Sequence, residues 1–388
     1  MRIIAKAFVI SYCMKVWVKK LLKILPYVFL AAVLILVPIL VFPCLKKSEQ
    51  TPKQDYSGLV NMWHIENFEG GSFNRYQYLL RQMIELEKKH KGLLVSIKTL
   101  TATEARNLVD QGHLPDLVSF GTGTGDIFLD YAVSYRGKLN IREDFIVSGT
   151  VGDEVKAVAY MTGGYFVLCN NNFMKEASID TKANLLDNIY KAGYTYNKGK
   201  SIRYSVVTAR ENNLPLAAVL KNTSQTSIEN SILWAPNQFE AYNSFVSGAA
   251  CMLLGTQRDL HRVLNRISQN NFFEFEVQFL QGYTDLVQYV AITSKDQNTQ
   301  AKVQLIIEYL TSESAQRSLT SVGMFGVDGT KCYTGQLLKD MEAALQSSLV
   351  IPNAFISSKK LDSLHELTIS ATKGNQETRN EIKSQLGI

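Results

Sequence analysis

Histidine, cysteine and carboxylate side chains carry most metal and acid–base chemistry, and this sequence spaces them in no recognised pattern. None of its five histidines has another histidine, a cysteine or a glutamate at ligand spacing, and the motif H-E-x-x-H is absent. We therefore expect no zinc site and no cofactor. The histidines are His64, His90, His113, His261 and His365.

A glycine-rich stretch raises the question of nucleotide binding. Residues 121–125 read GTGTG and follow an apolar run typical of a strand. The dinucleotide pattern G-x-G-x-x-G requires a glycine at position 126, where Asp126 would instead repel a pyrophosphate. The P-loop pattern G-x-x-x-x-G-K-[ST] does not occur either. Nucleotide binding is disfavoured.

Hydrolytic chemistry has little more support. No G-x-S-x-G nucleophile elbow is present. Glu274 and Glu276 have the spacing of two side chains on one face of a strand. A solvated sheet face explains them more simply than a glycosidase pair, which must lie in a cleft with its two groups set apart. The sequence thus favours a protein that is not an enzyme, and a cell-surface glycoside hydrolase is the alternative.

Aromatic residues are the more suggestive candidates for a binding site. Trp63 ends an apolar run, Tyr160 and Tyr165 flank a double glycine, and Trp234 lies in the loop-like stretch SILWAPN. Such rings stack on the flat faces of sugars, while nearby polar groups bind hydroxyls. They also pack well in protein cores. Both interpretations of these residues remain open at this point.

The elements around these residues predict an α/β fold. Strands are expected at residues 58–65, 93–97 and 115–120, and helices at 72–91 and 101–111, where Thr101 and Glu104 form a capping-box pattern. This alternation indicates a parallel sheet covered on both faces. Ligands bind such sheets at the carboxyl ends of the strands, which here lead into residues 64–71 and 121–126.

A second α/β region follows. Apolar stretches at 155–170, 202–209, 249–254, 272–280 and 286–293 read mostly as strands, and 181–194, 238–246 and 297–310 as helices. The tail from Tyr333 onward reads as mostly helical.

The N-terminal segment is predicted to hold the protein at a membrane. Residues 24–45 carry no charge, and their 22 residues exceed the roughly 20 that a helix needs to cross a bilayer. Residues 1–23 hold basic but no acidic side chains, which places the N-terminus in the cytoplasm. The run is long for a cleaved signal, so an uncleaved anchor is favoured. Lipidation of Cys44 is the alternative, disfavoured by the bulky Phe42 and Pro43.

Charge and cysteine content disfavour two further classes, nucleic-acid binders and disulfide-rich proteins. The formal net charge is +6, and the first 23 residues alone carry six basic groups, so the remaining chain balances at 35 basic and 35 acidic residues. A nucleic-acid binder would need a basic stripe on its folded part, so this class is disfavoured. Cys169, Cys251 and Cys332 follow no disulfide pattern and read as small buried residues.

Several stretches, taken in order, resemble the extracellular solute-binding proteins of bacterial ABC importers, the group that includes maltose-binding protein. The resemblance runs from about Gly58 to Leu319. The stretches that carry it are GLVNMWHIENFEGG (58–71), LEKKHKGLLVSIKTLT (86–101), GHLPDLVSFGTGTGD (112–126), AVAYMTGGYFVLCNNNFM (157–174), FEAYNSFVSGAACMLLGTQRD (239–259) and YVAITSKDQNTQAKVQLIIEYLTSESAQRSL (289–319).

This resemblance implies a two-lobed, type II periplasmic-binding-protein-like fold, preceded here by one transmembrane helix. Residues 1–23 would be cytoplasmic, 24–45 the anchor and 46–57 a tether. Lobe 1 would comprise residues 58–162 and 255–310, and lobe 2 residues 163–254 and 311–388. The chain would cross between lobes near 163–166, 251–254 and 310–312, with Gly163 and Gly164 as a hinge. Cys169 and Cys251 would then lie on neighbouring strands, which leaves a disulfide between them open.

The resemblance also implies a function. The protein would bind a small polar ligand, with a sugar or oligosaccharide preferred, and deliver it to the permease subunits of an ABC importer at the cell membrane. A ligandless signalling or scaffold member is a further alternative. By position, with Trp234 added from its sequence context, the expected ligand contacts are Trp63, His64, Glu66, Gly121, Thr122, Thr124, Tyr160, Tyr165, Trp234, Gln257 and Arg258.

Overall fold

The computed structural model divides the chain into two units, Met1–Asp55 and Tyr56–Ile388. It describes residues 56–66, 74–180, 187–192, 204–220, 227–270 and 272–386. The predicted cytoplasmic segment, membrane span and most of the tether lie outside these residues. Among the helices that are described, none is long and apolar enough to cross a bilayer.

The first sheet has five strands in the order β2-β1-β3-β12-β6. β1 is parallel to both β2 and β3, while β12 is antiparallel to β3 and to β6. The predicted parallel sheet is therefore a mixed one, with a single reversed strand that returns from far along the chain. The bounds are β1 Gly58–Ile65, β2 Leu93–Leu100, β3 Leu117–Gly121, β6 Val158–Thr162 and β12 Val287–Ile292.

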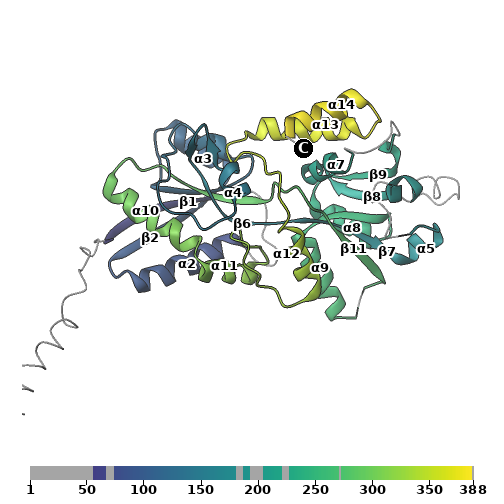
Figure 1. The fold of residues 1–388 in the computed structure, drawn as a ribbon, viewed down its shortest axis with the longest axis horizontal. Helices are drawn as coiled ribbons and strands as arrows, with labels where there is room; N and C mark the ends of the chain where they lie inside the picture. Colours follow the sequence, from purple (N-terminus) through teal and green to yellow (C-terminus); the bar gives the residue numbers. More distant parts are fainter. Residues whose placement is uncertain are drawn as a thin grey trace, which may run out of the picture. The chain divides into compact units, whose positions relative to one another are not determined.

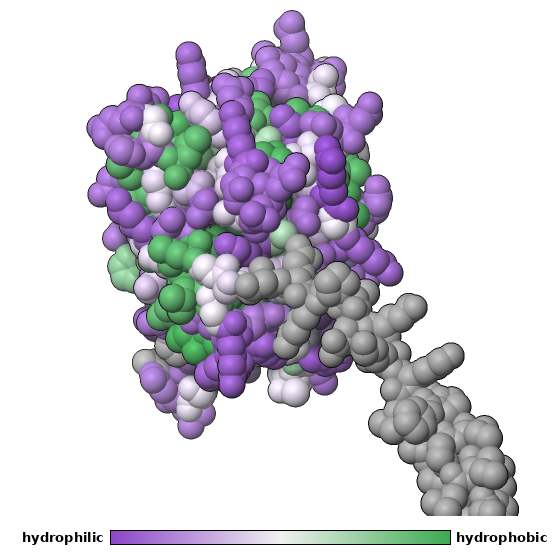
Figure 2. Space-filling view, turned by 90° about the vertical axis from the view of Figure 1, so that its left-hand side faces the viewer, coloured by the Kyte–Doolittle hydropathy of each residue, from purple (hydrophilic) through white to green (hydrophobic). Residues whose placement is uncertain are grey.

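Helices cover both faces of this sheet. α2 (Arg75–Lys89) and α10 (Gln297–Leu310) pack on the face that carries Val60 and Met62. α3 (Ala102–Asp110) packs on the face of Trp63. The predicted capping box is present, since the Thr101 hydroxyl accepts the Glu104 N–H and the Glu104 carboxylate accepts the Thr101 N–H at 2.8 Å. The outward side of this lobe is mostly hydrophilic (Figure 2).

The second sheet has five strands in the order β11-β7-β10-β8-β9. β8, β9 and β10 are parallel, and β7 is antiparallel to β10 and β11. Trp234, predicted in a loop, lies in β9, because Ile232 and Leu233 continue the β8 ladder. The bounds are β7 Tyr165–Asn170, β8 Tyr204–Ala209, β9 Ile232–Ala235, β10 Ala250–Thr256 and β11 Phe275–Phe279.

Shorter elements complete the unit. Of the predicted helix 181–194, the structure describes residues 187–192, which are helical. The remaining strands are β4 Thr150–Val151 and β5 Glu154–Val155. The remaining helices are η1 Gly125–Phe128, α4 Glu143–Ser148, α5 Asn171–Glu176, η2 Arg210–Asn212, α7 Leu214–Leu220, η3 Glu229–Ser231, α8 Gln238–Val246, α9 Gln257–Ser268, α11 Glu313–Arg317, η4 Ser318–Val322, α12 Gln336–Ala344, α13 Ser358–Ala371 and α14 Gln376–Leu386.

The chain passes between the two sheets at places that only partly match the prediction (Figure 1). One passage is at Gly163 and Gly164, between β6 and β7, as expected. The next lies between β11 and β12, at residues 280–286; the predicted crossing at 251–254 is the interior of β10. β11 therefore belongs with the second sheet, although the sequence placed residues 255–310 in lobe 1.

The C-terminal part is also shared between the sheets. α11 and η4 follow α10 and pack near α2, so residues 310–312 stay on the side of the first sheet. Phe325 then bridges to Thr162, α12 contacts β11, and α13 and α14 pack on α7 beside the second sheet. The third passage accordingly follows Phe325.

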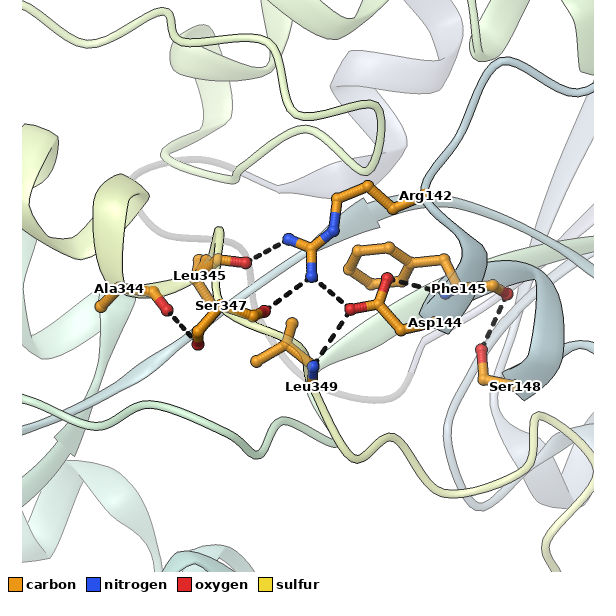
Figure 3. A network of polar contacts seen from close by, with 8 residues as sticks. All are labelled: Arg142, Asp144, Phe145, Ser148, Ala344, Leu345, Ser347 and Leu349. Atoms are coloured by element: carbon orange, nitrogen blue, oxygen red, sulfur yellow. Dashed lines mark hydrogen bonds and ion pairs between the residues drawn. The ribbon is translucent and has the colours of Figure 1, made fainter.

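A polar clasp holds the segment after α12 (Figure 3). The Arg142 guanidinium donates to the carbonyl oxygens of Leu345 and Ser347 and pairs with the Asp144 carboxylate. Asp144 in turn accepts the N–H of Leu349 at 3.1 Å. A cation at the carbonyl end of a helix is favourable because it opposes the helix dipole. The clasp thereby fixes where the third passage lies against α4.

Candidate functional site

A cavity of about 340 Å³ lies where three parallel strands of the second sheet end. Each strand contributes the residues that follow it: Glu211 and Asn212 after β8, Asn237 to Phe239 after β9, and Thr256 to Arg258 with Arg262 after β10. Leu286, from the passage into β12, closes one side. The carboxyl ends of parallel strands are the usual ligand site of open α/β sheets, and the volume suits a small molecule.

Local sequence explains why helices start at this edge. The side chain of Asn237 accepts the Glu240 N–H at 2.9 Å and so caps α8. Thr256 and Asp259 form a capping box at the start of α9, where the Asp259 carboxylate accepts the Thr256 N–H at 3.0 Å. Because both helices begin directly after a strand, their first-turn side chains line the cavity.

Beneath the cavity runs a chain of hydrogen bonds centred on Gln238. Its Nε2 donates to Asp259 Oδ2 at 2.6 Å, and its Oε1 accepts from Asn212 Nδ2 at 3.2 Å. Asp259 also pairs with Arg262 Nη1 at 2.7 Å. Burial raises the pKa of Asp259, although these donors and the nearby Arg262 charge oppose the shift. The chain keeps α8 and α9 in register around the cavity.

Gln257 connects the cavity with the first passage between the sheets. Its Oε1 accepts the Gly164 N–H at 3.2 Å, and its own N–H donates to the Gly164 oxygen at 3.0 Å. A Cβ at Gly163 would lie 2.4 Å from Gln257 Oε1. Gly163 thus leaves space for Gln257, and a Cβ at Gly164 would lie 3.2 Å from Leu345. The role as a hinge that the sequence suggested for this double glycine stays a prediction.

The same passage carries a buried carboxylate. Asp285 lies between β11 and β12, and its Oδ1 accepts from the Tyr165 hydroxyl at 2.5 Å. Its Oδ2 accepts from the Tyr283 hydroxyl at 3.3 Å. Burial raises the pKa of Asp285 to about 6, while both hydroxyls act in the opposite direction. Tyr165, predicted as a ligand contact, thus joins the two passages to one another.

At the first sheet the predicted residues form part of the core. His64 Nδ1 lies 3.0 Å from Ser119 Oγ, which lies 2.9 Å from the Tyr160 hydroxyl. Gln288 Nε2 also donates to Ser119, and Arg75 donates to Gln288. All five side chains are buried. Burial, helped by the nearby Arg75 charge, lowers the pKa of His64 to about 3, so this imidazole is neutral at physiological pH.

The other predicted contacts divide between the core and the surface. Trp63 is 8% exposed and packs in the core, which selects between the two interpretations that the sequence left open. Gly121, Thr122 and Thr124 are buried, and Thr124 Oγ1 donates back to the Gly121 oxygen. Trp234 is half-buried against the core of the second lobe. On the first lobe only Glu66 of the predicted set is exposed; residues 67–73, which follow it, lie outside the described part of the chain.

Of the predicted site, the cavity therefore gathers Gln257 and Arg258. Sequence reasoning missed Glu211, Asn212, Asn237, Gln238, Phe239, Thr256, Arg262 and Leu286. Part of the signal existed, because Glu211, Asn212 and Thr256 closely follow the predicted strands 202–209 and 249–254. The rule that ligands bind at strand ends holds for these two predicted strands of the second region as well. Asn237, Gln238 and Phe239 follow β9, which the sequence read as a loop, so no predicted strand end pointed to them.

The remaining candidates from the sequence are a metal site, the cysteines and the pair Glu274 and Glu276. The described residues contain no group of three or more histidine, cysteine, aspartate or glutamate side chains that could hold a metal ion. Cys169, Cys251 and Cys332 are free thiols. Glu274, directly before the edge strand β11, is highly exposed and pairs with Lys175 at 3.0 Å, so it faces solvent.

Comparison with known proteins identifies the fold. The sequence matches no family model and no curated protein. Solved structures do match. The GacH receptor of Streptomyces glaucescens, solved unliganded and with acarbose, is 12% identical with a TM-score of 0.58, covering 85% of this chain and 99% of that one. The galacto-N-biose/lacto-N-biose I-binding protein of a Bifidobacterium longum ABC transporter is 13% identical, with a TM-score of 0.60 and coverages of 86% and 98%.

A third match is the sugar-binding protein MalE of Xanthomonas citri, 11% identical with a TM-score of 0.60 and coverages of 85% and 96%. These matches span nearly the full length of the solved structures that are matched. The chain therefore has the two-lobed α/β fold of the maltose-binding-like solute-binding proteins, as the sequence predicted.

Proposed function

We propose that this protein is an extracytoplasmic receptor of an ABC importer that binds a sugar or oligosaccharide between its two lobes. One observation carries the proposal: the cavity at the ends of β8, β9 and β10 lies beside the passage at Gly163 and Gly164. A ligand there touches the second lobe at the point about which the lobes would move. Contacts to both lobes would favour a closed state by their differential affinity.

The lining suits a polar, hydroxylated ligand. Glu211, Asn212, Asn237 and Gln238 offer hydrogen-bonding groups, and Phe239 offers an aromatic face that is 54% exposed. Sites for small molecules combine apolar surface with a few placed polar groups in this way. Structural neighbours that bind acarbose and lacto-N-biose support a carbohydrate.

A thermal-shift and calorimetric screen with mono- and oligosaccharides tests the proposal. Ligand that binds only the native state raises the melting temperature by mass action. Asn212→Trp would fill the cavity and abolish the shift, whereas Gln77→Trp, on the exposed surface of α2, serves as the matched control. A sugar that stabilises the protein without being cleaved supports a receptor. Cleavage would favour the glycoside hydrolase, and no response to any sugar would contradict the proposal.

The membrane anchor at residues 24–45 belongs to the same proposal. An importer receptor must stay close to its permease, and a retained helix would keep it at the cell membrane with the folded unit outside. Intact-mass analysis of the mature protein tests this. Retention of Met1 supports the anchor, while a chain that starts at a lipidated Cys44 would replace it by a lipid.

A further inference from the structure

Helix α9 carries three arginines on one face. Arg258, Arg262 and Arg266 are spaced four residues apart, so they follow one another along the helix at intervals of about 6 Å. The first two line the cavity, and all three are half-buried, with part of each side chain open to solvent. The row thus begins inside the cavity and leads out of it.

Aromatic rings of α8 contact two of these guanidinium groups, those of Arg262 and Arg266. The Arg262 guanidinium lies 5.2 Å from the centre of the Phe239 ring and 5.4 Å from that of Tyr242. The Arg266 guanidinium lies 5.8 Å from the Tyr242 ring. Cation–π contacts of this kind fix the side chains in place, so that less freedom is lost when they bind an anion.

Three carboxylates lie near this row, and one of them, Glu211, is among the residues that line the cavity. Asp259 is fully buried under the helix and is engaged by Thr256, Gln238 and Arg262. Glu211 lies after β8, and its carboxylate accepts the Gln238 N–H at 3.3 Å. Glu240 is exposed in the first turn of α8. Among the lining residues, Arg258 and Arg262 face the cavity from α9, and the only lining carboxylate, Glu211, comes from the β8 side, so the α9 wall is cationic. Burial and the Arg262 charge both lower the pKa of Arg258, as expected for like charges held close together.

We propose that the ligand is an acidic oligosaccharide of the uronate class, which enters the cavity at Arg258 and extends along α9 past Arg266. This rests on the proposed receptor function and specifies its substrate. A guanidinium binds a carboxylate through paired, charge-assisted hydrogen bonds, which a neutral sugar does not offer. Ring faces of the sugar can stack on Phe239, and hydroxyls can pair with Asn212 and Glu211 on the opposite wall.

Titration calorimetry on the full chain in detergent micelles tests the inference with two acids, trigalacturonate and trimannuronate, and their neutral methyl esters. The esters keep the rings and linkages and remove only the charge. We expect at least one acid to bind about tenfold more tightly than its ester at low salt, with the difference shrinking as salt screens the charges.

Variants assign the effect to the arginine row. Arg258→Gln and Arg266→Gln should each weaken binding of the acid several-fold and weaken binding of the ester much less, at unaltered melting temperature. Arg81→Gln, exposed on α2, is the matched control and should change neither. Equal binding of acid and ester, or binding of neutral sugars alone, overturns the acidic ligand and leaves the receptor intact. If no sugar binds, both the receptor function and the acidic ligand are overturned.

Discussion

The two sheets end in polar clusters that are used in opposite ways. At the first sheet, His64, Ser119, Tyr160 and Gln288 bond to one another and are closed to solvent. At the second sheet, Gln238 and Asp259 form the floor of a cavity whose walls remain open. The first cluster lies within the strands, one or two residues before the ends of β1, β3 and β6, whereas the second follows the strand ends. Of these two clusters, the second is the one that offers groups to a ligand.

The difference comes from what covers each strand end. At the first sheet, Arg75 from α2 reaches Gln288, a residue 213 positions away, and is buried together with it. At the second, α8 and α9 each begin with a capped turn, and Gln238 of α8 donates to Asp259 of α9. Other residues of these first turns line the cavity. Position along the strand predicts where polar groups gather, and long-range partners decide whether they are available.

The largest expected loss of stability comes from removing Arg75, which donates a hydrogen bond to the first cluster. Arg75→Ala removes a buried guanidinium, leaves Gln288 without its donor and creates a cavity in the core. We expect the free energy of unfolding to fall by about 3–5 kcal/mol. Urea denaturation followed by circular dichroism measures this. Arg106→Ala, which removes an exposed partner of Asp126, should cost under about 1 kcal/mol. A loss of similar size for both variants would mean that the first cluster is not a structural core.

The second expected effect is a pH dependence of stability that arises from Asp285, in the passage between β11 and β12. Asp285 has its pKa raised to about 6 by burial, above the ordinary value of 3.8. The folded protein therefore favours the protonated form of Asp285. The contribution of this group to the free energy of unfolding is fully present below about pH 4 and is lost as the pH rises through about 6. The two pKa values correspond to a change of about 2–3 kcal/mol. Asp285→Asn should remove this pH dependence while keeping an oxygen for Tyr165.

Unfolding curves measured between pH 4 and 8 compare this variant with the parent. A parent whose stability does not fall across that range more steeply than that of the variant would show that Asp285 is not the group responsible.

Much of the fold could be predicted from the sequence. Apolar runs bounded by capped helices located β1, β2, β3 and α3, because these elements depend on neighbouring residues. The order of the crossings could not be derived in the same way. β10 and β11 are both apolar runs, and which sheet each one joins depends on pairing with β7, which local sequence does not encode.

The site was predicted less well for a related reason. Trp63 and Tyr160 have the residue types of sugar contacts, but burial depends on α3 and on the Ser119 cluster, which come from distant segments. Conversely, Phe239 looks like an ordinary helix residue. Its importance arises because Asn237 starts α8 at that point and places the first turn against the cavity.

The smallest expected effect on stability is also the most informative about the comparison. Asn212→Ala removes one hydrogen bond to Gln238 at a half-exposed position of the cavity. We expect the free energy of unfolding to change by less than about 0.5 kcal/mol, while affinity for the ligand falls.

Ser119→Ala is its counterpart at the first sheet, where a buried hydroxyl with three side-chain partners is lost. That variant should lose about 1–3 kcal/mol of stability and, once folded, bind ligand normally. If instead Ser119→Ala weakened binding as much as Asn212→Ala does, the first cluster would belong to the ligand site, and the contrast between the two strand ends would not hold.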